Sequence, residues 1–221
     1  MALPLRVRVF YWVTFLACAS PLAGLLYEVA PVFGPALFPS WTPSWESELG
    51  PNPVETLLHQ TGRTALFLLL ATLAITPIRR LSGWNRIQLV RRMVGVWSFF
   101  YGVCHLLIYV VFNHSGDTAA IWDDVIHRPF IFVGMFTFVM LLVLAATSTN
   151  GMMRRLGKNW ARLHRLVYVA AIAGVVHFVW GQKADIGEPL RWGAVLAVLL
   201  AIRLVYAWRK RQGRPVSSVS R

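Results

Sequence analysis

The hydrophobic positions of this chain gather in six long runs separated by short polar segments. A helix needs about 20 residues to cross the ~30 Å hydrocarbon layer of a membrane, and several of these runs are long enough. Backbone groups in lipid must bond within their own segment, so unbroken runs favour helices over a barrel. We therefore predict six transmembrane helices, at about residues 8–29, 54–78, 93–113, 130–149, 165–182 and 191–208.

These runs define an all-α integral membrane protein, a bundle of about six transmembrane helices that forms a single membrane domain over residues 1–221. The chain is 57% hydrophobic and only 14% charged, whereas a soluble domain carries about a quarter charged residues. The first run lacks a small-residue cleavage site, so we expect a retained span. No extramembrane stretch is long enough for a nucleotide-binding domain, and no internal repeat is apparent. Any flavoprotein partner is therefore expected to be a separate chain.

The chain has a net charge of +13, and the distribution of this charge along the sequence is what informs the prediction. Arginines and lysines fill the segments before the first span, between the second and third, between the fourth and fifth, and after the sixth. The acids fall in or beside the opposite loops: Glu28, Glu46, Glu48, Glu55, Asp117, Asp123, Asp124, Asp185 and Glu188. This asymmetry follows the positive-inside rule. It predicts cytoplasmic termini, and it indicates orientation rather than binding to nucleic acid.

Position along the predicted spans singles out three of the six histidines, His105, His164 and His177. The third span enters from the cytoplasmic side near Met93, so His105 lies about 18 Å along it at 1.5 Å per residue. The fifth span runs in the same direction, and His177 lies about 20 Å beyond His164. We therefore expect His105 and His177 at one depth in the outer half of the membrane, and His164 near the cytoplasmic face.

Two imidazoles at one depth on two helices are what a bis-histidine haem requires, because each face of the iron takes a neutral imidazole nitrogen. Zinc fits less well, since a tetrahedral site would need further ligands at that depth. The two cysteines, Cys18 and Cys104, lie inside spans and have no metal-binding spacing. A core histidine bonded to a carbonyl is the alternative for His105. Ionisable groups within a membrane are functional candidates by default, so His105 and His177 are candidate haem ligands.

His164 has no obvious histidine partner. Arg91, fourteen residues before His105, occupies a position where two-haem membrane cytochromes often carry a second histidine. The step from His164 to His177 also turns about 140° away from alignment on an ideal helix. These features favour one outer haem and a different inner site near His164, Arg91 and Arg92, with a second haem left open.

The second span carries two further candidates. His59 is expected near the outer boundary, as a possible additional axial ligand, and Arg63 lies one turn deeper. An arginine at mid-span costs about 2.5–3.5 kcal/mol on insertion scales, so Arg63 should pair with an anion such as a haem propionate, or else extend to lipid headgroups. His114 and His127 lie in the outer loop, where solvated histidines are expected.

Five segments carry a resemblance to a known family: HQTGRTAL, ITPIRR, RRMVGVWSFFYGVCHL, ATSTNGMMRRLGKNWARLHRLVYV and HFVW. In order and spacing they resemble the MsrQ (YedZ) family, the haem-binding membrane subunits of bacterial periplasmic methionine sulfoxide reductase systems. The resemblance covers about residues 52–182. The first span, the Pro- and Trp-rich loop that follows it, the span at 191–208 and the basic tail carry little of it.

The resemblance implies a ferric-reductase-like transmembrane domain in the bacterial inner membrane that binds haem b, and in this family also FMN. It implies electrons from the quinone pool or a cytoplasmic flavin reductase. They would pass to a periplasmic molybdopterin catalytic subunit, the other half of a heterodimer, which reduces methionine sulfoxide in oxidised proteins. The family's functional histidines map onto His105, His164 and His177.

The expected mechanism is electron transfer across the membrane, from an inner donor site to an outer haem, by a subunit that does not itself reduce methionine sulfoxide. One rival is a stand-alone haem-b ferric or quinone reductase, which co-purification with a molybdoprotein would distinguish. Another is a small transporter whose histidines relay protons. That rival predicts no visible chromophore.

Overall fold

The computed structural model describes residues 4–37, 49–182 and 186–212. Every regular element in these residues is helical; η1 is a 3₁₀ turn and η2 a π-helical turn. In chain order the elements are α1 (Leu5–Leu37), α2 (Pro53–Ser82), η1 (Asn85–Ile87), α3 (Gln88–Ile108), η2 (Tyr109–Asn113), α4 (Thr118–His127), α5 (Pro129–Ala146), α6 (Asn150–Leu156), α7 (Lys158–Leu163), α8 (Leu166–Gly181) and α9 (Gly187–Arg211).

Six stretches of the described residues are long and apolar enough to cross a membrane, and they correspond to the six predicted runs. The prediction of an all-α, multi-pass membrane protein is therefore confirmed. Some helices extend beyond the predicted spans: α1 continues past residue 29 to Leu37, and α2 continues past residue 78 to Ser82. Pro77 lies inside this helix without ending it. It removes a single backbone N–H, and a side chain from α9 replaces that donor, as described below.

Local sequence explains where the main helices begin and end. The Asn52 side chain accepts from the Glu55 backbone N–H, and Pro53 opens α2 at a position where its missing N–H costs nothing. Gly83 ends α2 with φ of 69°, in the left-handed region where a glycine is favoured. The Asp117 carboxylate caps α4 by accepting from the N–H groups of its first turn, at 2.9 and 3.2 Å.

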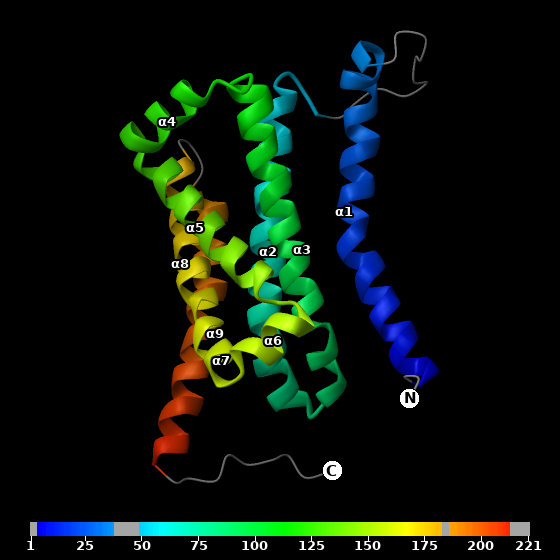
Figure 1. Ribbon diagram of the computed structural model, residues 1–221, viewed down its shortest axis with the longest axis vertical. Coiled ribbons are helices and arrows are strands. Elements are labelled where there is room, and N and C mark those ends of the chain that lie inside the picture. The colour runs from blue at the N-terminus through cyan, green and yellow to red at the C-terminus, as the bar shows by residue number, and fades with distance from the viewer. Residues whose placement is uncertain (1–3, 38–48, 183–185, 213–221) are drawn as a thin grey trace.

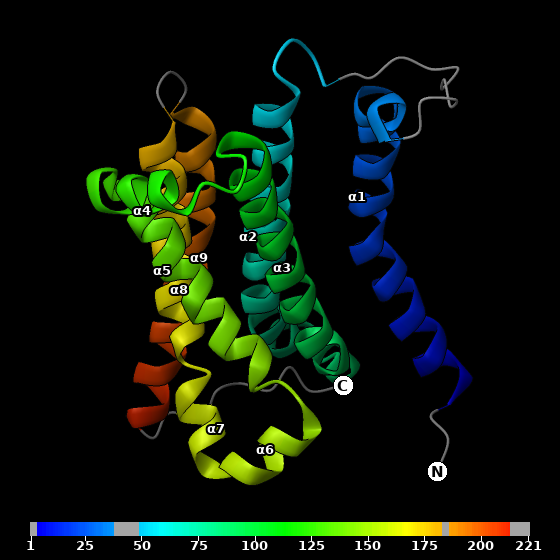
Figure 2. The ribbon, with the colours of Figure 1, turned by 45° about the horizontal axis from the view of Figure 1, so that its top comes forward.

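Two antiparallel helix pairs form the centre of the bundle. In both views α2 lies beside α3, and α5 lies beside α8 with α9 next to it (Figures 1 and 2). Helix α4 lies across one end of the bundle, whereas α6 and α7 lie at the other end, together with the start of α1 and the last turns of α9. We call these the acidic end and the basic end, after the charges predicted for them.

Helix α1 is the least integrated of the long helices and stands apart from the bundle in both views (Figures 1 and 2). It is attached mainly to α3. The hydroxyl of Tyr101, a fully buried residue, donates to the Cys18 carbonyl at 2.9 Å. Phe15 packs edge-on against Trp97, with ring centres 5.3 Å apart. The candidate site therefore depends on the four central helices rather than on α1.

Candidate functional site

The imidazoles of His105 and His177 face each other between the two helix pairs. Their ring centres are 6.2 Å apart and their planes are nearly perpendicular, at 86°. His105 lies near the end of α3 and His177 near the end of α8. The two histidines therefore lie at the same level of the bundle, as their positions along the helices predicted.

Each ring is held by a backbone carbonyl of the partner helix. His105 Nδ1 lies 2.9 Å from the Leu58 carbonyl oxygen, and His177 Nδ1 lies 2.7 Å from the Phe130 carbonyl oxygen. With Nδ1 as the donor, each Nε2 keeps its lone pair, and neither Nε2 makes a hydrogen bond to another described residue. A histidine that ligates a metal ordinarily donates its other ring N–H in this way. The core-histidine alternative accounts for Nδ1 of His105 but not for the second imidazole that faces it.

Two glycines make room for the rings. A Cβ atom added at Gly62 would lie 3.1 Å from His105 Nδ1, and one at Gly134 would lie 2.7 Å from His177 Nδ1. Real Cβ contacts are essentially never under 3.0 Å, so a side chain at Gly134 would displace the imidazole. Both glycines stand four residues after the residue whose carbonyl holds the ring. The site thus depends on backbone as well as side chains.

The two halves of the site repeat each other. Leu58, Gly62 and His105 recur as Phe130, Gly134 and His177, each 72 residues later, as the steps from 62 to 134 and from 105 to 177 show. The sequence carries the same signal as GVCH at 102–105 and GVVH at 174–177. The expectation of no internal repeat was therefore wrong: it overlooked a short motif on two helices that differ elsewhere. This motif could have identified the paired histidines, and its 72-residue offset also relates Gly62 to Gly134.

The histidines line a cavity of about 470 Å³ between the helix pairs, which we call the histidine cavity. Its volume falls in the usual range for small-molecule and cofactor sites. Its walls are mostly apolar and include Leu66, Leu69, Phe138, Leu141 and Phe178. Its polar lining residues include Asn52, Glu55, His59, Arg63, Asn113 and Arg128. An apolar chamber with polar groups at one side suits a flat hydrophobic cofactor that carries charged substituents.

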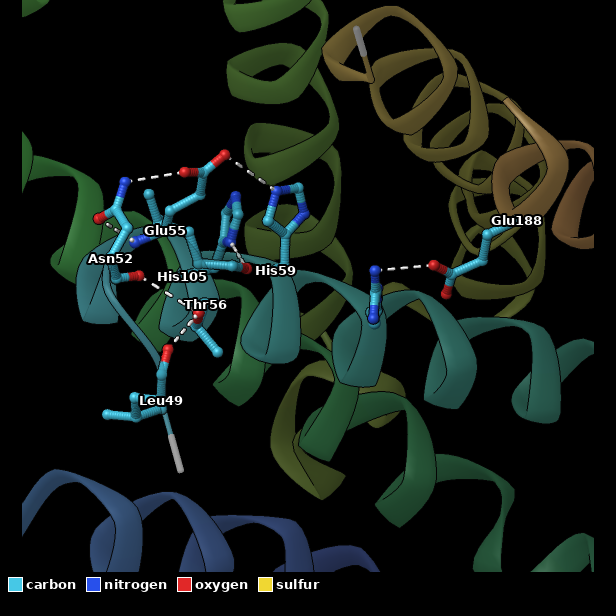
Figure 3. A network of polar contacts seen from close by, with 9 residues as sticks. Leu49, Asn52, Glu55, Thr56, His59, His105 and Glu188 are labelled. Carbon is cyan, nitrogen blue, oxygen red and sulfur yellow. Dashed lines mark hydrogen bonds and ion pairs between the residues drawn. The ribbon is translucent and has the colours of Figure 1, made fainter. Parts of the chain in front are cut away.

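His59 and Arg63 both line this cavity, but each is already paired with a carboxylate. Figure 3 labels His59 and the two carboxylate residues, Glu55 and Glu188. His59 Nε2 lies 3.8 Å from a Glu55 carboxylate oxygen, and Arg63 Nη2 lies 2.7 Å from a Glu188 carboxylate oxygen. The sequence analysis expected a propionate or lipid headgroups as the anion beside Arg63. The protein instead supplies a carboxylate from α9, because the start of α9 lies next to the start of α2.

The segment that joins η2 to α5, predicted to be an outer loop, makes more internal contacts than its composition suggests. Asp124 is buried and accepts from the Tyr109 hydroxyl at 2.8 Å and from Arg128 Nε at 2.9 Å, and it pairs with His114 Nε2 at 3.1 Å. His114 is only 16% exposed, so the expectation of a solvated histidine was wrong there. His127 pairs with Asp123 and is 68% exposed, as expected for the loop. Asp124 thus ties α4 to the end of α3.

His164 lies at the basic end, apart from the histidine cavity. Its Nε2 is 3.2 Å from the Thr147 hydroxyl, and its ring stacks on Trp160 with centres 4.0 Å apart. Trp160 also donates to the Thr147 carbonyl at 2.9 Å. No second imidazole lies beside His164 in the described part of the chain. Arg91 lies within electrostatic range of it.

The side chain of Arg92 contacts α6. Its guanidinium donates to the Asn150 side chain and lies 3.3 Å from Met153 Sδ. The 72-residue repeat places Arg92, not Arg91, at the position that matches His164. The structure therefore brings His105, His177, His59 and Arg63 together around one cavity, brings Arg91 near His164, and turns Arg92 towards α6.

The facing histidines can act as two ligands of one metal ion. Imidazole–metal bonds are about 2 Å long, so two imidazoles on opposite sides of one metal ion have ring centres about 6 Å apart. The observed separation agrees with this value. No cluster of three or more His, Cys, Asp or Glu side chains that could hold a metal occurs among the residues described. The site therefore offers two imidazoles within an apolar cavity, an arrangement that suits a metal whose other ligands come from a macrocycle.

Comparison with known proteins identifies the family of this chain. Residues 61–175 match the family of the ferric reductase like transmembrane component. The chain is similar to the protein-methionine-sulfoxide reductase heme-binding subunit MsrQ of Herminiimonas arsenicoxydans, with 48% identity over 167 residues. The aligned region covers 74% of this chain and 77% of the relative.

Relatives of the same name from other bacteria also match over most of the chain. MsrQ of Rhodospirillum rubrum is 49% identical over 75% of this chain and 80% of its own length. MsrQ of Xanthomonas axonopodis pv. citri is 43% identical over 79% of this chain and 80% of its own length. The family match at residues 61–175 includes all of α3 and α5 and the larger part of α2 and α8. The chain therefore belongs to the MsrQ family, within the ferric-reductase-like transmembrane proteins.

Proposed function

We propose that this protein binds haem b between His105 and His177 and carries electrons across the bacterial inner membrane. The observation that supports this most directly is the facing pair of imidazoles, 6.2 Å apart and each anchored through Nδ1 to a carbonyl of the neighbouring helix. A proton relay would not need two rings fixed in this mutual orientation. The names of the relatives, which describe heme-binding subunits, point in the same direction.

The chain's own groups prepare the site for this role. The carbonyls of Leu58 and Phe130 hold both rings in the tautomer that leaves Nε2 free as a ligand. The apolar walls lower the local dielectric around the rings. Arg63 and Arg128 lie at the polar side, where cations can orient an anionic edge. Haem, when bound, supplies one-electron chemistry, while the protein controls its orientation, access and potential.

We further propose the direction of transfer. By the positive-inside rule the basic end is cytoplasmic, so both termini are cytoplasmic and the histidine cavity lies in the outer half of the membrane. Electrons from the quinone pool or a cytoplasmic flavin reductase enter near His164 and Arg91, where FMN is the candidate inner cofactor. They leave from the histidine cavity to a periplasmic molybdopterin catalytic subunit, which repairs oxidised methionine in periplasmic proteins.

One experiment tests the core of this proposal. The purified full chain is reduced, and its reduced-minus-oxidised absorption spectrum is recorded. The proposal expects a low-spin haem b spectrum, lost or converted to a high-spin form when His105 or His177 is replaced by alanine. A colourless protein, or an unchanged spectrum in both variants, would refute it. Co-purification with a molybdoprotein then distinguishes the reductase subunit from a stand-alone haem reductase.

A further inference from the structure

The buried polar atoms that lack a partner gather in one region of the described structure. They are Thr76 Oγ1, Arg79 Nε and Arg203 Nε. Thr76 and Arg79 lie in the last two turns of α2, and Arg203 lies in the second half of α9. All three atoms can donate a hydrogen bond. Buried polar groups are nearly always bonded, so three free donors in one region point to a missing acceptor.

Arg203 is fixed in this region by two other hydrogen bonds. Pro77 has no N–H, so the carbonyl of Leu73, four residues earlier, loses its helical donor. Arg203 Nη2 donates to that carbonyl at 2.6 Å, and Nη1 donates to the Tyr168 hydroxyl at 2.7 Å. The guanidinium also lies over the Tyr168 ring, 5.2 Å from its centre. Arg203 is therefore held in place while its Nε stays free.

Arg91 reaches the same region from α3. Thr72 packs on Gly95 across the antiparallel pair α2–α3. One helical turn further along both helices, this register places Thr76 opposite Arg91. Arg91 also lies within electrostatic range of Arg203. We call Arg79, Arg91 and Arg203 the arginine cluster, because α2, α3 and α9 each contribute one guanidinium to it.

The arginine cluster has no carboxylate beside it among the described residues. The acidic residues among those described lie in helix turns or loops towards the acidic end of the bundle. They are Glu28, Glu55, Asp117, Asp123, Asp124 and Glu188. Cations in a low-dielectric interior repel one another and are costly without an anion. The protein thus brings positive charge and free donors together and leaves the anion to come from elsewhere.

We propose that the arginine cluster, with the Thr76 hydroxyl, is an oxyanion site that binds a phosphate group reaching it from the basic end. Guanidinium groups bind phosphate through paired, charge-assisted hydrogen bonds. Donors on three different helices can approach a tetrahedral anion from several sides, whereas a carboxylate offers its acceptors in one plane. The phosphate belongs either to a soluble phosphomonoester or to an anionic lipid headgroup. This inference rests on the inner donor site of the proposed function and names the chemical group that binds there. It does not depend on haem in the histidine cavity.

The test measures binding by thermal unfolding of the delipidated full chain in dodecyl maltoside. The probes are inorganic phosphate, phosphatidylglycerol in mixed micelles, and flavin mononucleotide with riboflavin as its phosphate-free control. Sodium chloride at equal ionic strength corrects for screening. A ligand that binds only the folded protein raises the unfolding midpoint with its concentration, so each midpoint series yields a dissociation constant. A response to phosphate or flavin mononucleotide identifies a soluble ligand, and a response to phosphatidylglycerol alone identifies a lipid.

Matched variants decide whether the cluster is responsible. Arg91→Gln and Thr76→Val should each weaken binding of the responding probe about tenfold or more. Arg80→Gln is the control. Arg80 lies on α2, as Thr76 does, but its guanidinium stacks on Tyr206, with the guanidinium carbon 4.8 Å from the ring centre. Far-UV circular dichroism and gel filtration check folding. The proposal is overturned if no phosphate-bearing probe acts beyond sodium chloride, or if Arg91→Gln and Arg80→Gln respond alike.

Discussion

The imidazole of His105 faces that of His177 at 6.2 Å between ring centres, and the two planes are nearly perpendicular. We predict that His105→Ala and His177→Ala each abolish the low-spin haem spectrum or convert it to a high-spin one. Either change opens one axial position, and His59, another imidazole that lines the cavity, is already paired with Glu55. Absorption spectra of the purified variants measure this.

His127→Ala is the control for this prediction, because His127 is exposed in the outer loop and pairs only locally with Asp123. His114 is unsuitable as a control, since its pairing with buried Asp124 gives it a structural role. If His127→Ala lost haem while His105→Ala kept the low-spin spectrum, the ligand assignment would be wrong.

Replacing Gly62 or Gly134 by alanine should weaken haem binding, and more so where the added Cβ atom lies closer to the imidazole. A Cβ atom at Gly134 would lie 2.7 Å from the His177 ring, whereas one at Gly62 would lie 3.1 Å from the His105 ring. Overpacking of this kind costs about 1–3 kcal/mol. We therefore expect Gly134→Ala to lower haem occupancy about tenfold and Gly62→Ala to lower it less, as measured by haem titration.

Gly24→Ala on α1 provides the reference for both glycine variants, because a Cβ there would meet no atom within 4 Å. It should titrate like the wild type. Equal losses in all three variants would mean that helix stiffness, rather than contact with the imidazoles, governs the effect.

Arg63 lies 2.7 Å from Glu188 and also lines the histidine cavity. If Arg63 additionally orients an anionic edge of the haem, Arg63→Gln should weaken haem binding more than Glu188→Gln does. Each single variant removes the same ion pair, which is partly exposed and should contribute about 1 kcal/mol or less to stability. Haem affinity and the unfolding midpoint are measured on both variants. Equal haem affinities in the two variants would mean that Arg63 only pairs with Glu188 of α9 and does not orient the haem.

His164 should govern entry of electrons rather than binding of the outer haem. It lies at the basic end, bonded to Thr147 and stacked on Trp160. We expect His164→Ala to slow reduction by quinol or reduced flavin while most of the low-spin signal is kept. Stopped-flow reduction kinetics give the rates, and complete loss of haem in this variant would contradict the division into inner and outer sites.

The orientation of the bundle is tested by reporter fusions. Fusions after Trp84 and after Asn159, both at the basic end, should report a cytoplasmic location, and one after Thr118 a periplasmic location. The physical reason is the preference of arginine and lysine for the cytoplasmic side. The reverse pattern would place the histidine cavity in the inner half of the membrane and reverse the proposed direction of transfer.

The sequence alone determined the elements of this protein. Runs of apolar residues define the membrane spans because lipid requires each segment to satisfy its own backbone. Helical rise then predicted a shared depth for His105 and His177, since 1.5 Å per residue holds for any α-helix. The same arithmetic separated His164 from them, and the segments around these histidines carried the resemblance to the MsrQ family.

Only the tertiary structure decided which groups meet. The pairing of Arg63 with Glu188 and the bond from Arg203 to the carbonyl freed by Pro77 join residues more than a hundred positions apart. No periodicity encodes such contacts, because they depend on how helices pack rather than on how each one forms. Depth along a helix is a local property, whereas the direction in which a side chain points across the bundle is set by its neighbours.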